Sequence, residues 1–188
     1  IKTGRYSLED DVKRIRIALD IAGKDRRVMT DANQVFNRNE ALRRGRVYQD
    51  MGLFWYEEPL QPHEMDGYAE LAEKLDIRIA TGENLYTKFQ FADLIARRGA
   101  DVVQPDNRRA GGVTEWMEIA AIADGYGLEL ASHGGGAVNM NMLLAMPNAI
   151  YMETGGPQKM IDGEVPAPQE PGMSTEVSKT EIEKYKVR

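Results

Sequence analysis

The chain has 188 residues, enough for one domain with a sizeable core, and 42% of them are hydrophobic while 29% are charged, which is typical of globular proteins. A net charge of −6 and the absence of cysteine exclude a basic nucleic-acid surface, a disulfide framework and a thiolate metal site. The sequence has no signal-peptide pattern and no apolar run of about 18 residues, so we expect no membrane partner and a cytoplasmic location.

Helix and strand patterns alternate along the chain. Residues 1–4 are typical of the end of a strand, and Ser7 with Asp10 forms a capping pattern before a helix that ends at Gly23. The pattern then predicts strands over 27–31, 53–57, 77–82, 101–104, 128–132 and 149–153, and helices over 37–51, 65–75, 87–98, 113–126 and 139–146.

This alternation predicts an α/β fold with a parallel sheet. A doubly wound sheet and a (β/α) barrel of the TIM type both fit. The regular period, together with the lack of a G-x-G-x-x-G loop, favours the barrel. The seven predicted strands leave the cylinder incomplete, so we expect further barrel material before residue 1. After residue 154 the chain is rich in Gly and Pro, which predicts an extended tail.

Every predicted strand ends in polar or charged residues. In (β/α) barrels the reacting groups lie at these carboxyl ends, and here the ends carry Lys2, Asp31, Glu57, Glu83, Asp106, His133 and Glu153. A single acid in such a place is usually a helix cap or a loop residue. Three consecutive ends, however, carry an acid at equal intervals, at Asp31, Glu57 and Glu83, so their charges converge and need a cation. Carboxylate oxygens without a cysteine or a nearby histidine indicate Mg²⁺.

Two further residues are candidate acid/base groups. Asp106 ends the strand before that of His133, so it can hold the imidazole in one tautomer and raise its basicity. Lys2 would lie across the barrel mouth, where desolvation beside other cations would lower its pKa. A satisfied structural histidine and a solvated terminal lysine are the alternative interpretations.

Seven motifs together resemble a known family, and they are IKTG, DANQ, WYEEP, TGEN, QPDNRRAGG, ASHG and YMET. In this order and spacing the chain resembles the C-terminal barrel of the enolase superfamily, mandelate racemase subgroup, over its whole length. The resemblance implies one Mg²⁺ bound by Asp31, Glu57 and Glu83.

The same resemblance implies the acid/base roles. His133 with Asp106 would form one acid/base group, Lys2 would face it from the opposite side, and Glu153 would hydrogen-bond the substrate carboxylate. In the family's mechanism Mg²⁺ holds that carboxylate and stabilises the enediolate that forms when a base removes the α-proton.

The resemblance also implies the domain organisation. The family's capping domain, its first barrel strand and the first lysine of its K-x-K motif would precede Ile1. Residues 1–154 would then form a (β/α)7β-like barrel segment, from the end of strand 2 through strand 8. Residues 155–188 would form an extended tail that packs on the barrel or toward the capping domain.

The leading functional hypothesis is an acid-sugar dehydratase that acts on a small-molecule carboxylate, an aldonate or aldarate, and gives a 2-keto-3-deoxy acid. The polar residues Asn33, Asn84 and Arg109 are the candidate substrate-binding groups, and surface charge is the alternative interpretation for Arg109. A racemase or epimerase of a 2-hydroxy acid needs the same two bases and stays open. A non-catalytic, metal-stabilised barrel is the alternative of another class. The Met-rich stretch 140–146 suggests a homo-oligomer, unless it belongs to the core.

Overall fold

The computed structural model describes residues 1–154, 160–169, 171–173 and 179–186. Its strands are β1 (Thr30–Asp31), β2 (Trp55–Glu57), β3 (Arg78–Thr81), β4 (Val102–Val103), β5 (Glu129–Ser132) and β6 (Ala149–Met152). Its helices are α1 (Leu8–Ala22), α2 (Arg38–Asp50), α3 (Met65–Lys74), α4 (Lys88–Ala96), α5 (Val113–Gly125), α6 (Ala137–Leu144) and α7 (Lys179–Tyr185).

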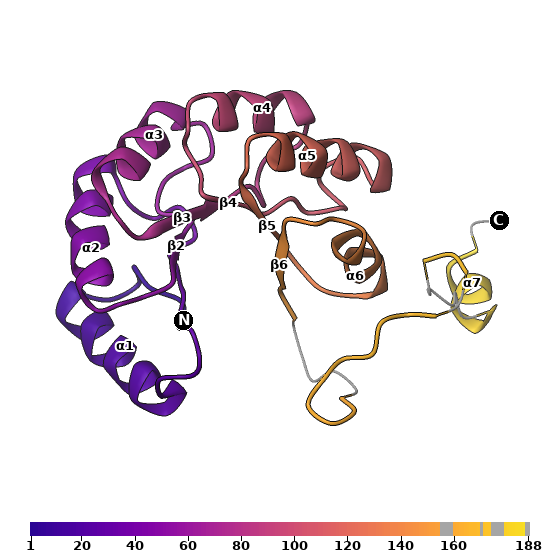
Figure 1. Ribbon diagram of the computed structural model, residues 1–188, viewed down its shortest axis with the longest axis horizontal. Helices are drawn as coiled ribbons and strands as arrows, with labels where there is room; N and C mark the ends of the chain where they lie inside the picture. Colours follow the sequence, from indigo (N-terminus) through magenta and orange to yellow (C-terminus); the bar gives the residue numbers. More distant parts are fainter. Residues whose placement is uncertain (155–159, 170, 174–178, 187–188) are drawn as a thin grey trace.

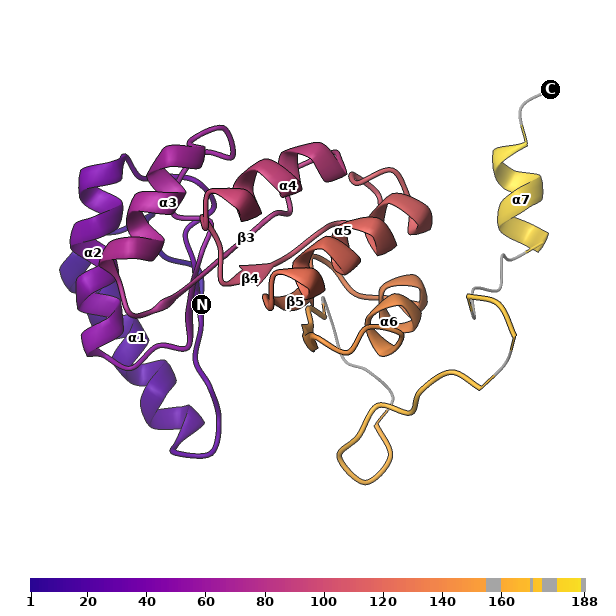
Figure 2. The same ribbon diagram turned by 45° about the horizontal axis from the view of Figure 1, so that its top comes forward.

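The six strands form one parallel sheet in the order of the sequence, from β1 to β6. The sheet curls, and α1 to α6 lie along its outer side, so that the strands form the inner wall of a half-barrel (Figure 1). The view in Figure 2 shows the same arc of helices around the strands. The predicted α/β fold, an incomplete TIM-type barrel, is therefore confirmed.

The segment before α1 extends this sheet. Lys2 forms a parallel bridge with Asp31, and the amide of Thr3 donates to the carbonyl of Asp31 at 2.9 Å. The sequence predicts a strand end here, and the structure shows an isolated bridge in its place. This bridge brings Lys2 to the edge of β1, beside the carboxyl end of the strand.

Two layers of side chains pack on the two faces of the sheet. The outer layer, between strands and helices, includes Tyr48, Tyr56 and Trp116, all fully buried. The inner layer consists of Trp55, Ala80, Val102 and Ala131. Neighbouring residues of a strand point to opposite faces, so Tyr56 points outward to the helices while Trp55 points into the barrel.

Capping side chains mark the first residue of several helices. The side chain of Ser7 accepts a hydrogen bond from the amide of Asp10 at the start of α1, which confirms the predicted capping pattern. Asn37 and Thr87 cap α2 and α4 in the same way. Each bond satisfies an amide that the first helical turn leaves without a partner.

The tail differs from the prediction in one place. The Gly- and Pro-rich composition predicts an extended segment, but residues 179–185 form α7. The Lys and Glu residues of this stretch favour a helix. How the tail packs stays a prediction. Among the described helices, none has the length and apolar character needed to cross a membrane.

Candidate active site

Three carboxylates converge at the carboxyl end of the first strands. Asp31 ends β1, Glu57 ends β2, and Glu83 follows β3, and each offers an oxygen that lies within 4.8 Å of the others. The sheet register produces this convergence, because Asp31 pairs with Glu57 and Glu57 with Ala80. Like charges this close repel one another unless a cation lies between them. The three predicted ligands could therefore hold a hard divalent cation.

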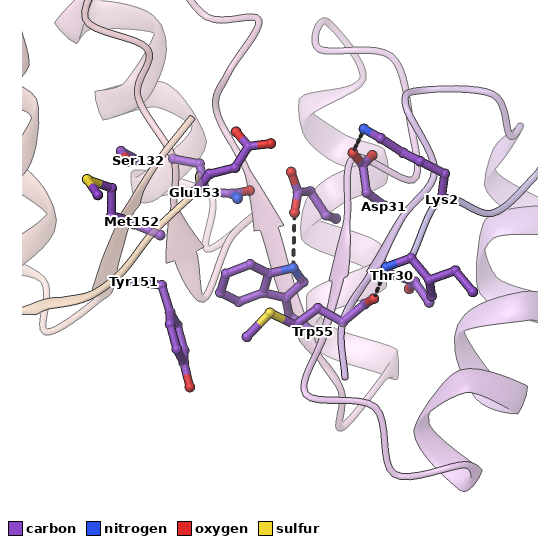
Figure 3. Close-up of a pocket in the computed structure, with 13 residues that line it drawn as sticks. Lys2, Thr30, Asp31, Trp55, Ser132, Tyr151, Met152 and Glu153 are labelled. Atoms are coloured by element: carbon purple, nitrogen blue, oxygen red, sulfur yellow. Dashed lines mark hydrogen bonds and ion pairs between the residues drawn. The ribbon is translucent and has the colours of Figure 1, made fainter. Parts of the chain in front are cut away.

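The three carboxylates, called the triad below, are Asp31, Glu57 and Glu83, and their negative charges repel one another. Burial raises the pKa of Glu57 to about 8, and the charge of Asp31 adds to the rise. Lys2 forms an ion pair with Asp31 from the edge of the sheet (Figure 3). Burial lowers the pKa of Lys2, but its hydrogen bond to Asp31 and the charges of the three carboxylates together outweigh this effect and raise the pKa above its usual value. Among the residues present, Lys2 thus acts as the counter-ion of a predicted metal ligand.

His133 and Asp106 form the predicted dyad at the opposite side of the triad. His133 Nδ1 lies 2.7 Å from Asp106 Oδ2. Burial raises the pKa of Asp106, but hydrogen bonds from the Arg108 amide and from His133 outweigh it and hold the pKa below its usual range. His133 Nε2 lies 3.4 Å from Glu83 Oε2, so the free nitrogen of the ring faces the carboxylates. This orientation suits a proton acceptor or donor for a molecule bound at the triad.

Glu153 lies beside the dyad. Its Oε2 accepts a hydrogen bond from the Gly134 amide at 2.6 Å and lies 3.9 Å from His133 Nε2. The side chain is 52% exposed and, in Figure 3, lies across the cavity from Lys2 and Asp31. A Cβ atom on Gly135 would approach the Glu153 carbonyl oxygen to 2.7 Å. Glycine at position 135 therefore permits the close approach of the two loops that places Glu153 here.

The three predicted substrate-binding residues contact the loops of the triad. The Asn33 amide donates to Asp31 Oδ1 at 2.8 Å. Asn84 Nδ2 donates to both oxygens of Glu58 at 3.0 Å and to Glu83 Oε1 at 3.1 Å. These residues support the carboxylates, and their contact with a substrate stays a prediction.

Arg109 is bound in the same framework. One of its guanidinium nitrogens donates to the Glu83 carbonyl at 2.7 Å and to Asn84 Oδ1 at 2.9 Å. The same nitrogen lies 3.5 Å from Glu83 Oε1. Arg109 therefore offsets part of the negative charge at Glu83, which the surface-charge interpretation does not anticipate.

Glu58, the residue after Glu57, connects the loops that follow β1 and β3 through side-chain hydrogen bonds. It is fully buried, and besides Asn84 it binds Gln34 Nε2, which donates to it at 2.7 Å. Burial raises the pKa of Glu58, while the hydrogen bonds of Gln34 and Asn84 oppose the rise. Glu58 thus joins the loops that follow β1 and β3 to its own loop after β2.

A cavity of about 350 Å³ opens below the triad. Besides the predicted residues Lys2, Asp31, Glu57 and Glu153, it is lined by residues that the sequence analysis did not single out, among them Trp55, Gln104, Ser132 and Tyr151 (Figure 3). Strand alternation could have identified three of these, because Trp55, Gln104 and Tyr151 each lie two residues before a residue of the predicted site.

Comparisons with known proteins agree with this geometry. Residues 1–181 match the family model described as enolase C-terminal domain-like. The chain is 36% identical over 133 residues to an arabinonate dehydratase from Saccharolobus solfataricus, a match that covers 71% of this chain and 36% of that protein.

Two solved structures have the same fold. The L-talarate dehydratase from Polaromonas sp. JS666, complexed with Mg and L-glucarate, aligns with a TM-score of 0.88 and 31% identity over 96% of this chain and 50% of that one. A racemase from Streptomyces coelicolor A3(2) with bound magnesium aligns with a TM-score of 0.90 and 30% identity over 97% and 54%.

The chain spans between about a third and about half of the length of these relatives. Within that span the family model covers the sheet, the six helices that surround it and every residue of the triad and the dyad. The chain therefore belongs to the enolase C-terminal domain-like family, the mandelate racemase and muconate lactonizing branch of the enolase superfamily.

Proposed function

We propose that this chain provides the metal site and the acid/base groups of an acid-sugar dehydratase. The observation that carries the proposal is the placement of His133 Nε2, which faces the three carboxylates from one side while Lys2 approaches them from the other. Because the chain covers only 36% and 50% of two of its relatives, the activity is proposed for a protein of their length that contains this chain, called the whole protein below.

Asp31, Glu57 and Glu83 would hold one Mg²⁺. Their donor set fits this ion, since all three offer hard carboxylate oxygens within one small volume. When bound, Mg²⁺ acts as a Lewis acid that offsets negative charge developing on a substrate carboxylate. Burial is the main cause of the raised pKa of Glu57, and a bound cation would offset the part of the rise that comes from the charge of Asp31.

The proton chemistry falls to the side chains on the two sides of the triad. His133 or Lys2 removes the proton on the carbon next to the substrate carboxylate. His133, held by Asp106, then donates a proton to the hydroxyl on the adjacent carbon, which leaves as water. The enol that remains gives up its hydroxyl proton and takes one up on the neighbouring carbon, which yields a 2-keto-3-deoxy acid, so one water is lost for each substrate converted.

Three observations support an acid sugar as the substrate. The dehydratases among the relatives are named for arabinonate and L-talarate. The mouth of the barrel carries hydrogen-bonding groups, including Asn33, Arg109 and Glu153. Glu153 is exposed to the cavity and would bind the carboxylate of the substrate, while Asn33, Asn84 and Arg109 would contact its hydroxyl or second carboxyl groups.

A racemase or epimerase is the second candidate, because Lys2 and His133 lie on opposite sides of the triad. Two bases in this arrangement can exchange a proton on both faces of one carbon, and one of the similar structures is a racemase. The two candidates differ in whether water leaves.

The deciding experiment is incubation of the whole protein with Mg²⁺ in D₂O and a panel of mono- and diacid sugars and 2-hydroxy acids, read by mass spectrometry. Loss of water from one acid sugar, abolished in a His133→Asn variant, is the expected result. Deuterium gain without loss of water would favour the racemase. No change in any compound of the panel, at a Mg²⁺ concentration that saturates the protein, would favour a non-catalytic barrel.

A further inference from the structure

Trp55 lies inside the half-barrel, directly below the predicted metal ligands. It is two residues before Glu57 in β2, so both side chains point to the inner face of the sheet. The inner positions around it are held by the smaller residues Ala80, Val102 and Ala131. These side chains leave room for the indole ring, which is only 6% exposed and lines the cavity.

The indole makes one polar contact, and its acceptor is a predicted metal ligand. Trp55 Nε1 donates a hydrogen bond to Glu57 Oε2 at 3.0 Å, the dashed line that leaves Trp55 in Figure 3. A carboxylate has two oxygens with about four acceptor sites. The indole N–H therefore uses one acceptor site of the Glu57 carboxylate, and the other sites can bind a cation.

Contacts from across the barrel hold the indole in this orientation. Tyr151 of β6 meets Trp55 edge-on, with ring centroids 5.7 Å apart and ring planes at 82°. Arg27 donates a hydrogen bond to the Tyr151 hydroxyl at 3.1 Å. Strands β2 and β6 are not neighbours in the sheet, so this contact depends on the curl that brings the two together.

We infer that Trp55 is a positioning residue that orients Glu57 for Mg²⁺. The indole N–H fixes the direction of the carboxylate before the cation arrives, so less side-chain freedom is lost on binding. Tyr151 and Arg27 keep the indole in place from the opposite side of the barrel. The inference rests on the proposed Mg²⁺ site and adds a residue to which no motif of the sequence assigns a function.

The first test measures the affinity of the whole protein for Mg²⁺ alone by titration calorimetry. Trp55→Phe removes the N–H and keeps an aromatic ring, and we expect Mg²⁺ to bind about 10- to 100-fold more weakly. Trp116→Phe is the matched control, because that indole is also buried, at 0% exposed against 6% for Trp55, but donates to the Pro105 carbonyl at 3.0 Å in the outer layer. The control should bind Mg²⁺ with unchanged affinity.

A second measurement needs no substitution in the molecule that is titrated. In protein with ¹⁵N-labelled tryptophan, the indole resonance of Trp55, assigned by its loss in Trp55→Phe, should shift with Mg²⁺ and saturate at the calorimetric Kd. The resonance of Trp116 should change much less.

The outcomes separate the inference from the proposed function. Mg²⁺ binding that is equally tight in Trp55→Phe and in the unmodified protein would overturn the inference and leave the metal site intact. An equal loss in Trp55→Phe and Trp116→Phe would overturn it as well, because the effect would then follow general destabilisation. Failure of the unmodified protein to bind Mg²⁺ would contradict the proposed function, and the inference with it.

Discussion

His133 Nδ1 lies 2.7 Å from Asp106 Oδ2, and His133 Nε2, the other nitrogen of the same ring, lies 3.4 Å from Glu83 Oε2. The imidazole thus spans the distance between a buried acid and the three carboxylates. Because Asp106 is held ionised by the Arg108 amide, it fixes the proton of a neutral imidazole on Nδ1 and leaves Nε2 free to accept one.

Replacing Asp106 tests this arrangement. In Asp106→Asn the charge that stabilises a protonated His133 is lost, and we expect kcat to fall about 10²- to 10⁴-fold. KM and the Mg²⁺ affinity should change little, because Asp106 does not belong to the triad. Steady-state kinetics of the whole protein with its acid sugar would show this, and a kcat within threefold of the unmodified value would contradict the role of the dyad.

The ion pair between Lys2 and Asp31 leads to a second prediction. Lys2→Met removes a cation that competes with Mg²⁺ for Asp31, so Mg²⁺ binding should be as tight as before or tighter. Turnover should fall, because one of the two opposing acid/base groups is lost. Deuterium exchange into substrate, followed by NMR, should then proceed on the face that His133 serves.

A lysine outside the site provides the control for this prediction. Lys74→Met breaks an exposed pair with Glu70 and should leave both turnover and Mg²⁺ affinity unchanged. If Lys2→Met weakened Mg²⁺ binding by tenfold or more, Lys2 would be supporting the triad, and its assignment as an opposing base would lose its basis.

The fold and the site residues are predictable from the sequence because one period generates both. Each βα unit returns the chain to the same end of the sheet. A strand-end residue such as Glu57 or Glu83 is therefore placed near its counterparts by topology alone, before any side-chain contact is known. The positions of these strand ends can be predicted from the local alternation of apolar segments with turn residues.

Contacts between distant strands are not predictable in this way. The edge-on contact of Trp55 with Tyr151 depends on how far the sheet curls, which no local pattern encodes. The pairing of Lys2 with Asp31 reverses the expected direction of the Lys2 pKa, because the sequence does not show which neighbour lies nearest. Asn84 is another case, since its amide contacts Glu58 and Glu83 through loops whose conformation only the structure reveals.

The raised pKa of Glu57 predicts how Mg²⁺ affinity depends on pH. Below its pKa of about 8, Glu57 carries a proton that Mg²⁺ has to displace. The apparent affinity should therefore rise about tenfold per pH unit as the pH increases toward 8 and level off above it. Calorimetry at a series of pH values between 6 and 9 would also show proton release below about pH 8.

A variant of Glu57 separates this effect from other titrations. Glu57→Gln has no proton to lose in this range, so its weaker Mg²⁺ binding should lack the rise toward pH 8.

The same pKa of Glu57 implies that, in metal-free protein, the folded state binds more protons than the unfolded state between about pH 4.5 and 8. The free energy of unfolding should therefore fall as the pH rises through this window. A flat affinity profile for the unmodified protein would contradict the raised pKa.

The last prediction concerns a buried ion pair that holds the segment before α1. The Asp11 carboxylate has no exposed surface and accepts hydrogen bonds from Arg44 at 2.8 Å, from Arg14 at 2.9 Å and from the Gly4 amide at 2.8 Å. Arg14 also donates to the Lys2 carbonyl at 2.9 Å. Asp11 thus connects two arginines to the backbone that carries Lys2.

We expect Asp11→Ala to lower the free energy of unfolding by about 1–3 kcal/mol, because it removes a buried acceptor shared by Arg44, Arg14 and the Gly4 amide, while Arg44 keeps its ion pair with Glu40 at 2.6 Å. Glu70→Ala, which breaks the exposed pair with Lys74, should cause no measurable loss. Urea unfolding of both variants of the whole protein would make the comparison. Equal, small losses would mean that the remaining pair with Glu40 satisfies Arg44, and the anchoring of the Lys2 segment would then have to come from its backbone bonds to β1, such as Thr3 to Asp31 at 2.9 Å.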